Sequence, residues 1–315
     1  MPRRSSRRSG SRTGASLALT ALVILAVLAG WLLLRPQPQP PHRRVVAIES
    51  PTPLPPETSP PLATPEPSPS PAAGASQAPA ASPVPTPTNN PSGVKLALIV
   101  DDCGQWIDTE RGFIALDVPL TLSVLPSVPY TGDVAREASN AGKGVMLHLP
   151  METLSGLNPG PGKVTTAMSD AQIVAQVQAD LAQVPLARGV NNHEGSKASA
   201  DSRVMHDVIG VLARHGDLFF IDSRTNPASV GEQTAQAMGV PTAGRDVFLD
   251  NRADVAYTEA QLLEAAEIAK RQGSAIAIGH PRPSTLAAVR EMIPRLEASG
   301  IQFVLAQDLV ATGSH

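Results

Sequence analysis

Residues 96–104 read LALIVDDCG, and the interpretation of the whole chain starts from this stretch. Its apolar run, rich in β-branched and leucine side chains, is typical of a strand buried on both faces of a parallel sheet. Two adjacent carboxylates, Asp101 and Asp102, and then Gly104 follow where the chain must turn. Neighbouring side chains on an extended backbone point to opposite faces, so we expect the two aspartates to perform different tasks. Either aspartate could instead cap the helix expected at residues 105–116.

The chain of 315 residues divides into regions of different composition. Residues 1–14 are basic, and residues 15–34 form an uncharged apolar run long enough to cross a ~30 Å hydrocarbon core as a helix. This order predicts a cytoplasmic tail, a single-pass transmembrane anchor and an exported C-terminal part. A cleaved signal peptide is the alternative, although no clear A-x-A site follows the run. Residues 35–92, dominated by Pro, Ala, Ser and Thr, predict a disordered linker, and residues 93–315 then form one domain.

Charge and cysteine content argue against nucleic-acid binding and against catalysis by a cysteine nucleophile. The net charge of −3 and the lack of basic clusters in residues 93–315 argue against a nucleic-acid partner. Cys103 is the single cysteine of the chain, so no internal disulfide can form. Neighbouring carboxylates disfavour its thiolate, and we therefore expect Cys103 to be a small buried side chain rather than a nucleophile.

Apolar runs that end in a His or an Asp recur five times after the first one. Strands that alternate with helical segments indicate parallel βαβ units. The predicted fold is α/β, a distorted (β/α) barrel of about seven parallel strands. In such barrels the carboxyl ends of all strands meet on one face, which carries the chemistry. The residues expected to converge there are Asp101, Asp102, His148, His193, Asp222, Asp250 and His280.

Helical periodicity separates the predicted strands. It is clearest after Asp170, which we expect to cap an amphipathic helix. Residues 153–169 are rich in Gly and Pro and predict a mobile flap beside the strand ends. Further helices are expected at residues 131–142, 200–214, 258–271 and 284–299.

Two polar clusters have the composition of cation sites. His148 and Glu152 lie four positions apart and could face one cation if the backbone turns between them. The turn at residues 191–196 contains two Asn residues, His193 and Glu194. A purely structural turn has use for Asn and Gly but does not need the histidine.

Five motifs occur in order along the domain. They are IVDDxG at 99–104, LHLPME at 147–152, GVNNHxGS at 189–196, FIDSRT at 220–225 and GHPxPxTL at 279–286. Together, over residues 94–310, they resemble the divergent polysaccharide deacetylase family of bacteria. The resemblance implies a metal-dependent hydrolase that acts on the C–N amide bonds of an N-acetylated envelope polysaccharide such as peptidoglycan. It implies a divalent metal, zinc, as cofactor, and places the predicted anchor in the bacterial inner membrane with the domain in the periplasm or otherwise outside the cytoplasm.

The resemblance also suggests residue roles. The classical polysaccharide deacetylases, from which this branch is set apart, open with paired aspartates, one a base and one a metal ligand, and the matching residues here are Asp101 and Asp102. They then supply two His ligands four positions apart, and the matching positions here are His148 and Glu152. Their acid histidine ends a late strand, as His280 does. Amide hydrolysis needs an activated water, a group that holds the oxyanion and an acid for the leaving amine, and these residue types provide each part.

The remaining site residues complete the predicted set. His193 could supply the second imidazole ligand in place of the residue at 152. We expect Asp222 to support catalysis by setting protonation states, and Arg224 to assist it. Glu194 and Arg282 stand where the family pattern has Met and His, so both could alter the substrate groove. The residues expected to contact substrate are Asn192, Arg224 and Arg282.

Two other functions remain open from sequence. The departure at Glu152 favours a catalytically inactive module that binds glycan or organises the envelope. Glycoside hydrolysis would need two carboxylates ~5–10 Å apart, which Asp101 with Asp222 or Asp250 could provide. Histidines at three strand ends favour metal chemistry over this alternative. The aromatic content of 3% predicts few sugar subsites, and the sequence makes no prediction of oligomeric state.

Overall fold

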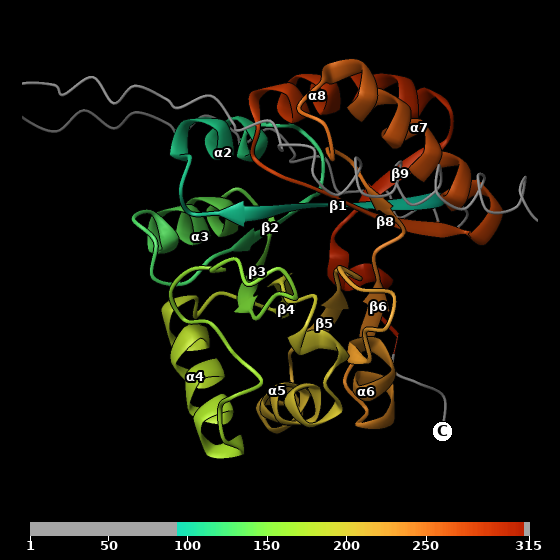
Figure 1. Ribbon diagram of the computed structural model, residues 1–315. Coiled ribbons are helices and arrows are strands. Elements are labelled where there is room, and N and C mark those ends of the chain that lie inside the picture. Colours follow the sequence, from blue (N-terminus) through green and yellow to red (C-terminus); the bar gives the residue numbers. More distant parts are fainter. Residues whose placement is uncertain (1–92, 312–315) are drawn as a thin grey trace, which may run out of the picture. The chain divides into compact units, whose positions relative to one another are not determined.

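The computed structural model describes residues 93–311 (Figure 1). The predicted cytoplasmic tail, transmembrane anchor and linker lie outside these residues, so those three predictions are not tested by the fold. Within residues 93–311, no helix combines the length and the apolar character needed to cross a membrane. The described part is an α/β fold around one sheet in which every ladder between strands is parallel, as the βαβ pattern predicts.

The sheet has nine strands in the order β6-β5-β4-β3-β2-β1-β8-β7, with β9 beside β1. The prediction of about seven strands is therefore too low. It omits β6, because that strand is only three residues long and lacks an apolar run. The strands are β1 Val94–Cys103, β2 Thr121–Val124, β3 Gly144–Met151, β4 Gly189–Glu194, β5 Phe219–Asp222, β6 Thr242–Gly244, β7 Val247–Phe248, β8 Ser274–Gly279 and β9 Ile301–Val304.

The sheet curls into an incomplete barrel. Strands β6 and β7 are the two ends of the hydrogen-bonded order, yet only Arg245 and Asp246 separate them in sequence. So short a connection requires the two edges to lie close together. No ladder joins β6 to β7 within residues 93–311, so the predicted barrel is curled but not closed.

Strand β1 is the centre of this sheet. It pairs with β8 through Lys95–Val100, while β9 and β2 pair in succession with its first and second halves. Its apolar run is buried on both faces, as predicted. Alternate residues belong to two cores, because successive strand side chains point to opposite faces. Leu98 belongs to the larger core and Ile99 to the smaller one.

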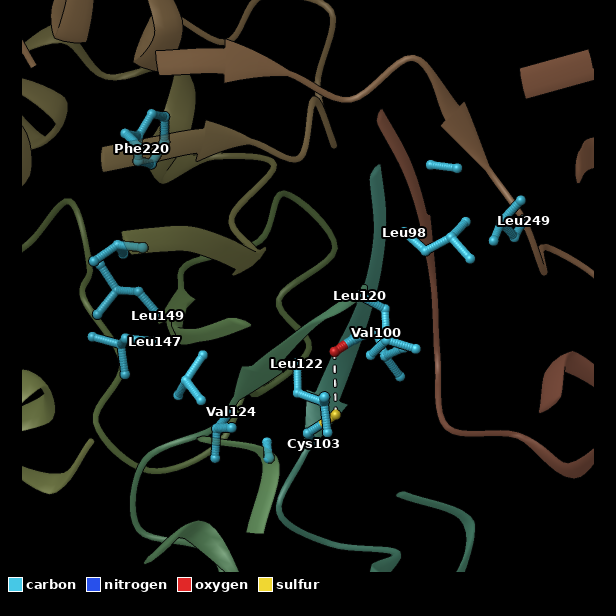
Figure 2. Close-up of a cluster of buried hydrophobic side chains, with 14 of the residues drawn as sticks. Leu98, Val100, Cys103, Leu120, Leu122, Val124, Leu147, Leu149, Phe220 and Leu249 are labelled. Atoms are coloured by element: carbon cyan, nitrogen blue, oxygen red, sulfur yellow. Dashed lines mark hydrogen bonds between the residues drawn. The ribbon is translucent and has the colours of Figure 1, made fainter. Parts of the chain in front are cut away.

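The larger core contains side chains that neighbouring strands direct to the same side (Figure 2). Cys103 belongs to it and is fully buried, in agreement with its expected role as a small buried side chain. Its thiol donates a hydrogen bond to the carbonyl of Val100 at 3.2 Å, and burial raises the pKa of the thiol. This cysteine is therefore not a nucleophile.

The helices lie on the outside of the curled sheet, and α7 and α8 pack against each other (Figure 1). One predicted cap is wrong, because α4 is capped by Ser169 and not by Asp170. The Ser169 Oγ accepts the Gln172 backbone N–H, and the Gln172 side chain accepts that of Ser169. The sequence analysis did not anticipate the short α6. The helices are α2 Ile107–Ile114, α3 Thr131–Asn140, α4 Asp170–Gln183, α5 Ser202–His215, α6 Gly231–Ala237, α7 Val255–Gln272 and α8 Pro283–Ala298.

Candidate active site

Asp102, His148 and His193 each direct one atom to a common point at the carboxyl ends of β1, β3 and β4. The Asp102 Oδ1 lies 3.2 Å from His148 Nε2 and 2.8 Å from His193 Nδ1, and the two ring nitrogens are 3.1 Å apart. Ligands bound ~2.0–2.2 Å from a tetrahedral ion lie roughly 3.3 Å from one another. The structure thus brings together three of the four predicted metal ligands at a spacing suited to one ion.

A bulge in β1 aims both aspartates at this point. The register between β1 and β2 shifts between Val100 and Cys103, and Asp102 has a left-handed φ of 58°. Both carboxylates consequently approach the His148 Nε2, which is 3.6 Å from Asp101 Oδ2 and 3.2 Å from Asp102 Oδ1. The expectation that the two side chains point to opposite faces is wrong, because a bulge breaks the alternation of a regular strand.

Glu110 of α2 fixes the loop that follows the bulge. Its Oε1 accepts the backbone N–H groups of Gly104, Gln105 and Trp106 at 2.8, 3.0 and 2.9 Å, and its side chain is fully buried. Neither paired aspartate caps α2, since Trp106 occupies the N-cap position without a side-chain hydrogen bond. The sequence does not single out Glu110, which is one of two acidic residues in the helix expected at residues 105–116.

Asn191 orients the first histidine ligand. His148 Nδ1 lies 2.8 Å from Asn191 Oδ1, and the Asn191 Nδ2 donates to Asp101 Oδ1 at 2.8 Å. An amide oxygen can only accept, so His148 carries its proton on Nδ1 and presents the Nε2 lone pair to the common point. Sequence analysis selected Asn192 rather than this residue. The Asn192 amide is buried and bonds to the Glu194 carbonyl and the Ser223 N–H, both at 2.9 Å, which places it in the wall of the site.

The surroundings of Asp102 fit a cation. Its Oδ1 is buried, and no hydrogen bond of normal geometry reaches that atom from the described residues. Two ring nitrogens nevertheless lie within 3.2 Å of it. Burial tends to raise the pKa of Asp102, but the adjacent imidazoles outweigh burial and lower it. A buried, ionised carboxylate oxygen between two ring nitrogens is an arrangement that a positive ion would satisfy.

Asp250 orients His280 on the other side of Asp102. The His280 Nδ1 lies 2.9 Å from Asp250 Oδ1, and its backbone N–H donates to Asp250 Oδ2 at 2.8 Å. Its free Nε2 is 3.7 Å from Asp102 Oδ2. Burial lowers the pKa of His280, but Asp250 and the Asp102 charge outweigh this effect and raise it. The histidine is therefore placed to hold a proton beside the common point. The sequence analysis placed Asp250 at this face but did not foresee its hold on His280.

Comparison with known proteins identifies the chain. A family model described as divergent polysaccharide deacetylase matches residues 98–310. The chain belongs to this family. It is 35% identical over 196 residues to an uncharacterized protein of Haemophilus influenzae, a match covering 62% of this chain and 70% of that one. It is also 35% identical over 202 residues to the uncharacterized protein YibQ of Escherichia coli, covering 64% and 63% of the two chains.

A solved structure shares the fold of this chain. The crystal structure of an uncharacterized protein from Agrobacterium tumefaciens C58 matches with a TM-score of 0.67 and 24% identity. The match covers 71% of this chain and 92% of that one. At this identity the match supports the fold alone.

In this family member, Glu152 lies outside the ligand cluster. Its Oε2 accepts both the N–H and the hydroxyl of Thr166 at 2.7 Å, and its Oε1 pairs with Lys197 Nζ at 2.8 Å. These bonds lower the pKa of Glu152 to about 2. One carboxylate oxygen thus holds Thr166 and the other holds Lys197, which leaves neither free for a cation at the common point.

Asp222 and Arg224 support the turn after β5. The buried Asp222 accepts the Arg224 N–H at 2.8 Å and the Ser229 hydroxyl at 2.7 Å. The Arg224 guanidinium pairs with Glu232 at 2.7 Å and donates to the Arg245 carbonyl at 3.0 Å. The structure does not bring either side chain into the cluster around Asp102, and their bonds are those of a scaffold.

Two cavities of the domain meet at Asp102. One, of about 440 Å³, lies on the His280 side, and the other, of about 270 Å³, lies on the His193 side. Arg282 lines the larger cavity, so the structure places this predicted substrate contact beside the site. The smaller cavity is bordered by residues 158–161 of the predicted flap. A chain-like ligand can therefore extend from the common point in two directions.

Proposed function

We propose that the domain is a metal-dependent deacetylase that hydrolyses the acetamide groups of an N-acetylated envelope polysaccharide, with peptidoglycan as the leading substrate. The observation that carries this proposal is the convergence of Asp102, His148 and His193 beside Asp101 and His280. Membership of the divergent polysaccharide deacetylase family supports the same substrate class.

Asp102, His148 and His193 would hold the cation. One carboxylate and two imidazoles form a donor set that zinc commonly takes, and three protein ligands leave a position open for chemistry. When bound, a divalent ion polarises the acetamide carbonyl and acidifies water. The Asn191 amide supports this set by fixing the His148 tautomer.

Asp101 is placed to act as the base. Its Oδ1 is occupied by the Asn191 amide at 2.8 Å, while its Oδ2 faces the common point, 3.6 Å from His148 Nε2. Burial raises the pKa of Asp101, which makes this carboxylate a stronger proton acceptor. In the proposed reaction, Asp101 takes a proton from the water whose oxygen attacks the acetamide carbon.

His280 is placed to act as the acid. It transfers its Nε2 proton to the amide nitrogen while the C–N bond breaks, and the products are acetate and a free amine on the glycan. Asp250 holds the opposite ring nitrogen at 2.9 Å and stabilises the protonated imidazole before the transfer. The proposed proton acceptor and proton donor thus both lie near the ligand cluster, Asp101 beside His148 and His280 beside Asp102.

The bonding of the other carboxylates does not favour glycoside hydrolysis. Asp250 is fully buried and bonded to His280 and Thr285, while Asp222 is bonded to the turn after β5. Neither is therefore free to act on a glycosidic bond together with Asp101.

The proposal is tested by metal analysis and acetate release. The purified chain is expected to contain about one divalent ion and to release acetate from N-acetylated glycan. Chelation should abolish the release, and added zinc should restore it. A chain that carries the ion but releases no acetate from peptidoglycan or from N-acetylglucosamine oligomers would instead support the inactive glycan-binding module.

We also propose that the domain works outside the cytoplasm, on the anchor and linker predicted at residues 15–92. The support is the sequence order of a basic tail, an apolar run and a Pro-rich stretch. A reporter enzyme that works only outside the cytoplasm should be active when it is fused after Pro91. If the fused reporter were active only in the cytoplasm, this topology would be contradicted.

A further inference from the structure

The larger cavity is lined by an aromatic ring and by a positive charge. Its volume of about 440 Å³ falls within the ~300–1,000 Å³ typical of small-molecule sites. It begins at Asp102 and His280, so it continues directly from the proposed reaction point. Its further lining consists of Trp106, Thr109, Pro281, Arg282 and Pro283.

Trp106 is an exposed aromatic residue on a fixed backbone. Its side chain is 51% exposed, although tryptophan side chains are usually mostly buried. Its backbone N–H donates at 2.9 Å to the buried Glu110, which also holds the two preceding residues. A tryptophan side chain on a fixed backbone offers a flat apolar surface at little cost in conformational entropy. Such a surface is suited to the C–H face of a sugar ring.

Arg282 lines the cavity with a positive charge, and no carboxylate of residues 93–311 forms a salt bridge with it. Its Nη1 donates to the main-chain carbonyl of Asp250, and this is the one side-chain hydrogen bond that Arg282 makes in the described part of the chain. A guanidinium has five N–H donors in a planar fork, so several remain available here. That fork matches a carboxylate, which it binds through two parallel hydrogen bonds.

We infer that the cavity on the His280 side is a subsite for an acidic sugar. Trp106 stacks on the sugar ring, and Arg282 pairs with its carboxylate. The neighbouring N-acetylated sugar of the same chain then lies at Asp102. This inference rests on the proposed function in one respect, namely that a glycan binds at Asp102. It narrows the substrate to glycans in which an acetamido sugar adjoins a sugar that carries a carboxylate.

Calorimetric titration with two matched probes tests the subsite. The first probe is a tetrasaccharide of alternating N-acetylglucosamine and N-acetylmuramic acid with free carboxylates. The second is the same tetrasaccharide with its carboxyl groups converted to primary amides. The full chain with Asp101→Asn is used, so that the probes are not hydrolysed. We expect the free acid to bind about tenfold more tightly, and added salt to reduce this preference.

Variants assign the preference to residues. Arg282→Gln should bind both probes equally, at the affinity that the parent shows for the amidated one. Arg290→Gln, which replaces an exposed arginine of α8, the helix that follows Arg282, should keep the preference. Trp106→Ala should lower the affinity for both probes by the same factor, since stacking does not depend on the carboxylate. Melting temperatures show whether each variant remains folded.

Three results would overturn the subsite. They are equal affinity of the Asp101→Asn parent for both probes, a preference that survives in Arg282→Gln, and no measurable binding of either probe. Failure of the deacetylase proposal gives a different result. A chain that prefers the free acid but never releases acetate, tested with Asp101 intact, keeps the subsite and removes the reaction. A chain that releases acetate equally from both probes, and binds them equally, keeps the reaction and removes the subsite.

Discussion

Asp180 of α4 lies against Gly162, and a Cβ added to Gly162 would be 2.5 Å from the Asp180 Oδ1. The Asp180 carboxyl is buried, with Gln176 donating to Oδ1 at 3.0 Å and no hydrogen-bond partner for Oδ2 in the described residues. Burial raises the pKa of Asp180 to about 7. Gly162 belongs to the loop that borders the His193 side of the site. A carboxyl group that titrates near neutral pH therefore supports this loop.

Asp180→Asn should stabilise the protein more at pH 8 than at pH 4. The folded-state pKa of about 7 exceeds the ordinary value of 3.8, so between these values the folded chain holds a proton that the unfolded chain releases. The parent consequently loses stability as pH rises from about 4 to 7, and the loss is complete above 7. Asparagine does not titrate, so the variant lacks this pH dependence of stability. Melting temperatures at both pH values check it, and an equal difference at pH 4 and pH 8 would contradict it.

Gly162→Ala should destabilise the protein more than Gly160→Ala. Both glycines have positive φ, at 79° and 104°, so both variants share a backbone cost of ~1–2 kcal/mol. Only Gly162 is crowded, because a Cβ at Gly160 meets nothing within 4 Å. The overlap with Asp180 should add roughly 1–3 kcal/mol to the cost at Gly162. Urea unfolding of the two variants measures the difference in their free energies of unfolding. Equal losses of stability would show that the loop shifts without cost to accommodate the added methyl group.

Replacing the two neighbouring aspartates should have different effects. Asp102→Asn should lose metal and turnover together, because removal of a charged ligand weakens affinity. Asp101→Asn should retain the metal and lose turnover, because an amide cannot accept the proton. Metal content and acetate release, measured on the same samples, separate the two roles. The assignment of Asp101 fails if Asp101→Asn acts on acetylated glycan as fast as the parent.

His280→Ala should keep the metal and slow the reaction by roughly 10²–10⁴-fold, the usual contribution of a positioned acid. His280 is not among the three clustered ligands, so metal content should not change. The structural alternative is that His280 only packs beside Pro281, in which case the loss would appear as a lower melting temperature. Full activity in a folded His280→Ala chain would remove the acid role.

Asp250→Asn should move the alkaline limb of the kcat profile to lower pH. The acid must be protonated, so turnover falls as pH rises through the His280 pKa, which Asp250 helps to raise. Loss of that negative charge lowers the pKa, and the fall then begins earlier. Thr285→Val is the matched control, because it removes one hydrogen bond to Asp250 at 2.7 Å and leaves the charge. An alkaline limb that does not move in Asp250→Asn would exclude this coupling.

Local sequence signals account for the parallel strands and for most of the residues at the strand ends. The LALIVDDCG run predicts its own burial, and the histidines at 148 and 193 follow apolar or short strand segments that sequence can recognise. Convergence of these ends follows from parallel topology, which the alternation of strands and helices already indicates. The convergence of Asp102, His148 and His193 could therefore be predicted without coordinates.

The features that could not be predicted from sequence depend on contacts between residues far apart in the chain. The bulge at Asp102 is set by pairing with β2, which no local pattern records. Asn191 and Asn192 are indistinguishable in sequence, and only the β4 register shows which one faces His148. Glu152 has suitable ligand spacing, but Thr166 and Lys197 bind its carboxylate first. Strand β6 is recognisable only from its neighbour β5.

The position of β1 has a consequence for synthesis of the chain. Lys95 pairs with Ser274 and Val94 with Ile301, so two of the three partners of β1 are the last strands to leave the ribosome. The ligands on β1, β3 and β4 are translated well before His280 on the β8 side. A nascent chain thus contains all three proposed cation ligands before it contains the proposed acid. Until β8 arrives, it also exposes an apolar strand edge that invites aggregation. Early capture of the ion would hold the first half of the sheet together during this interval.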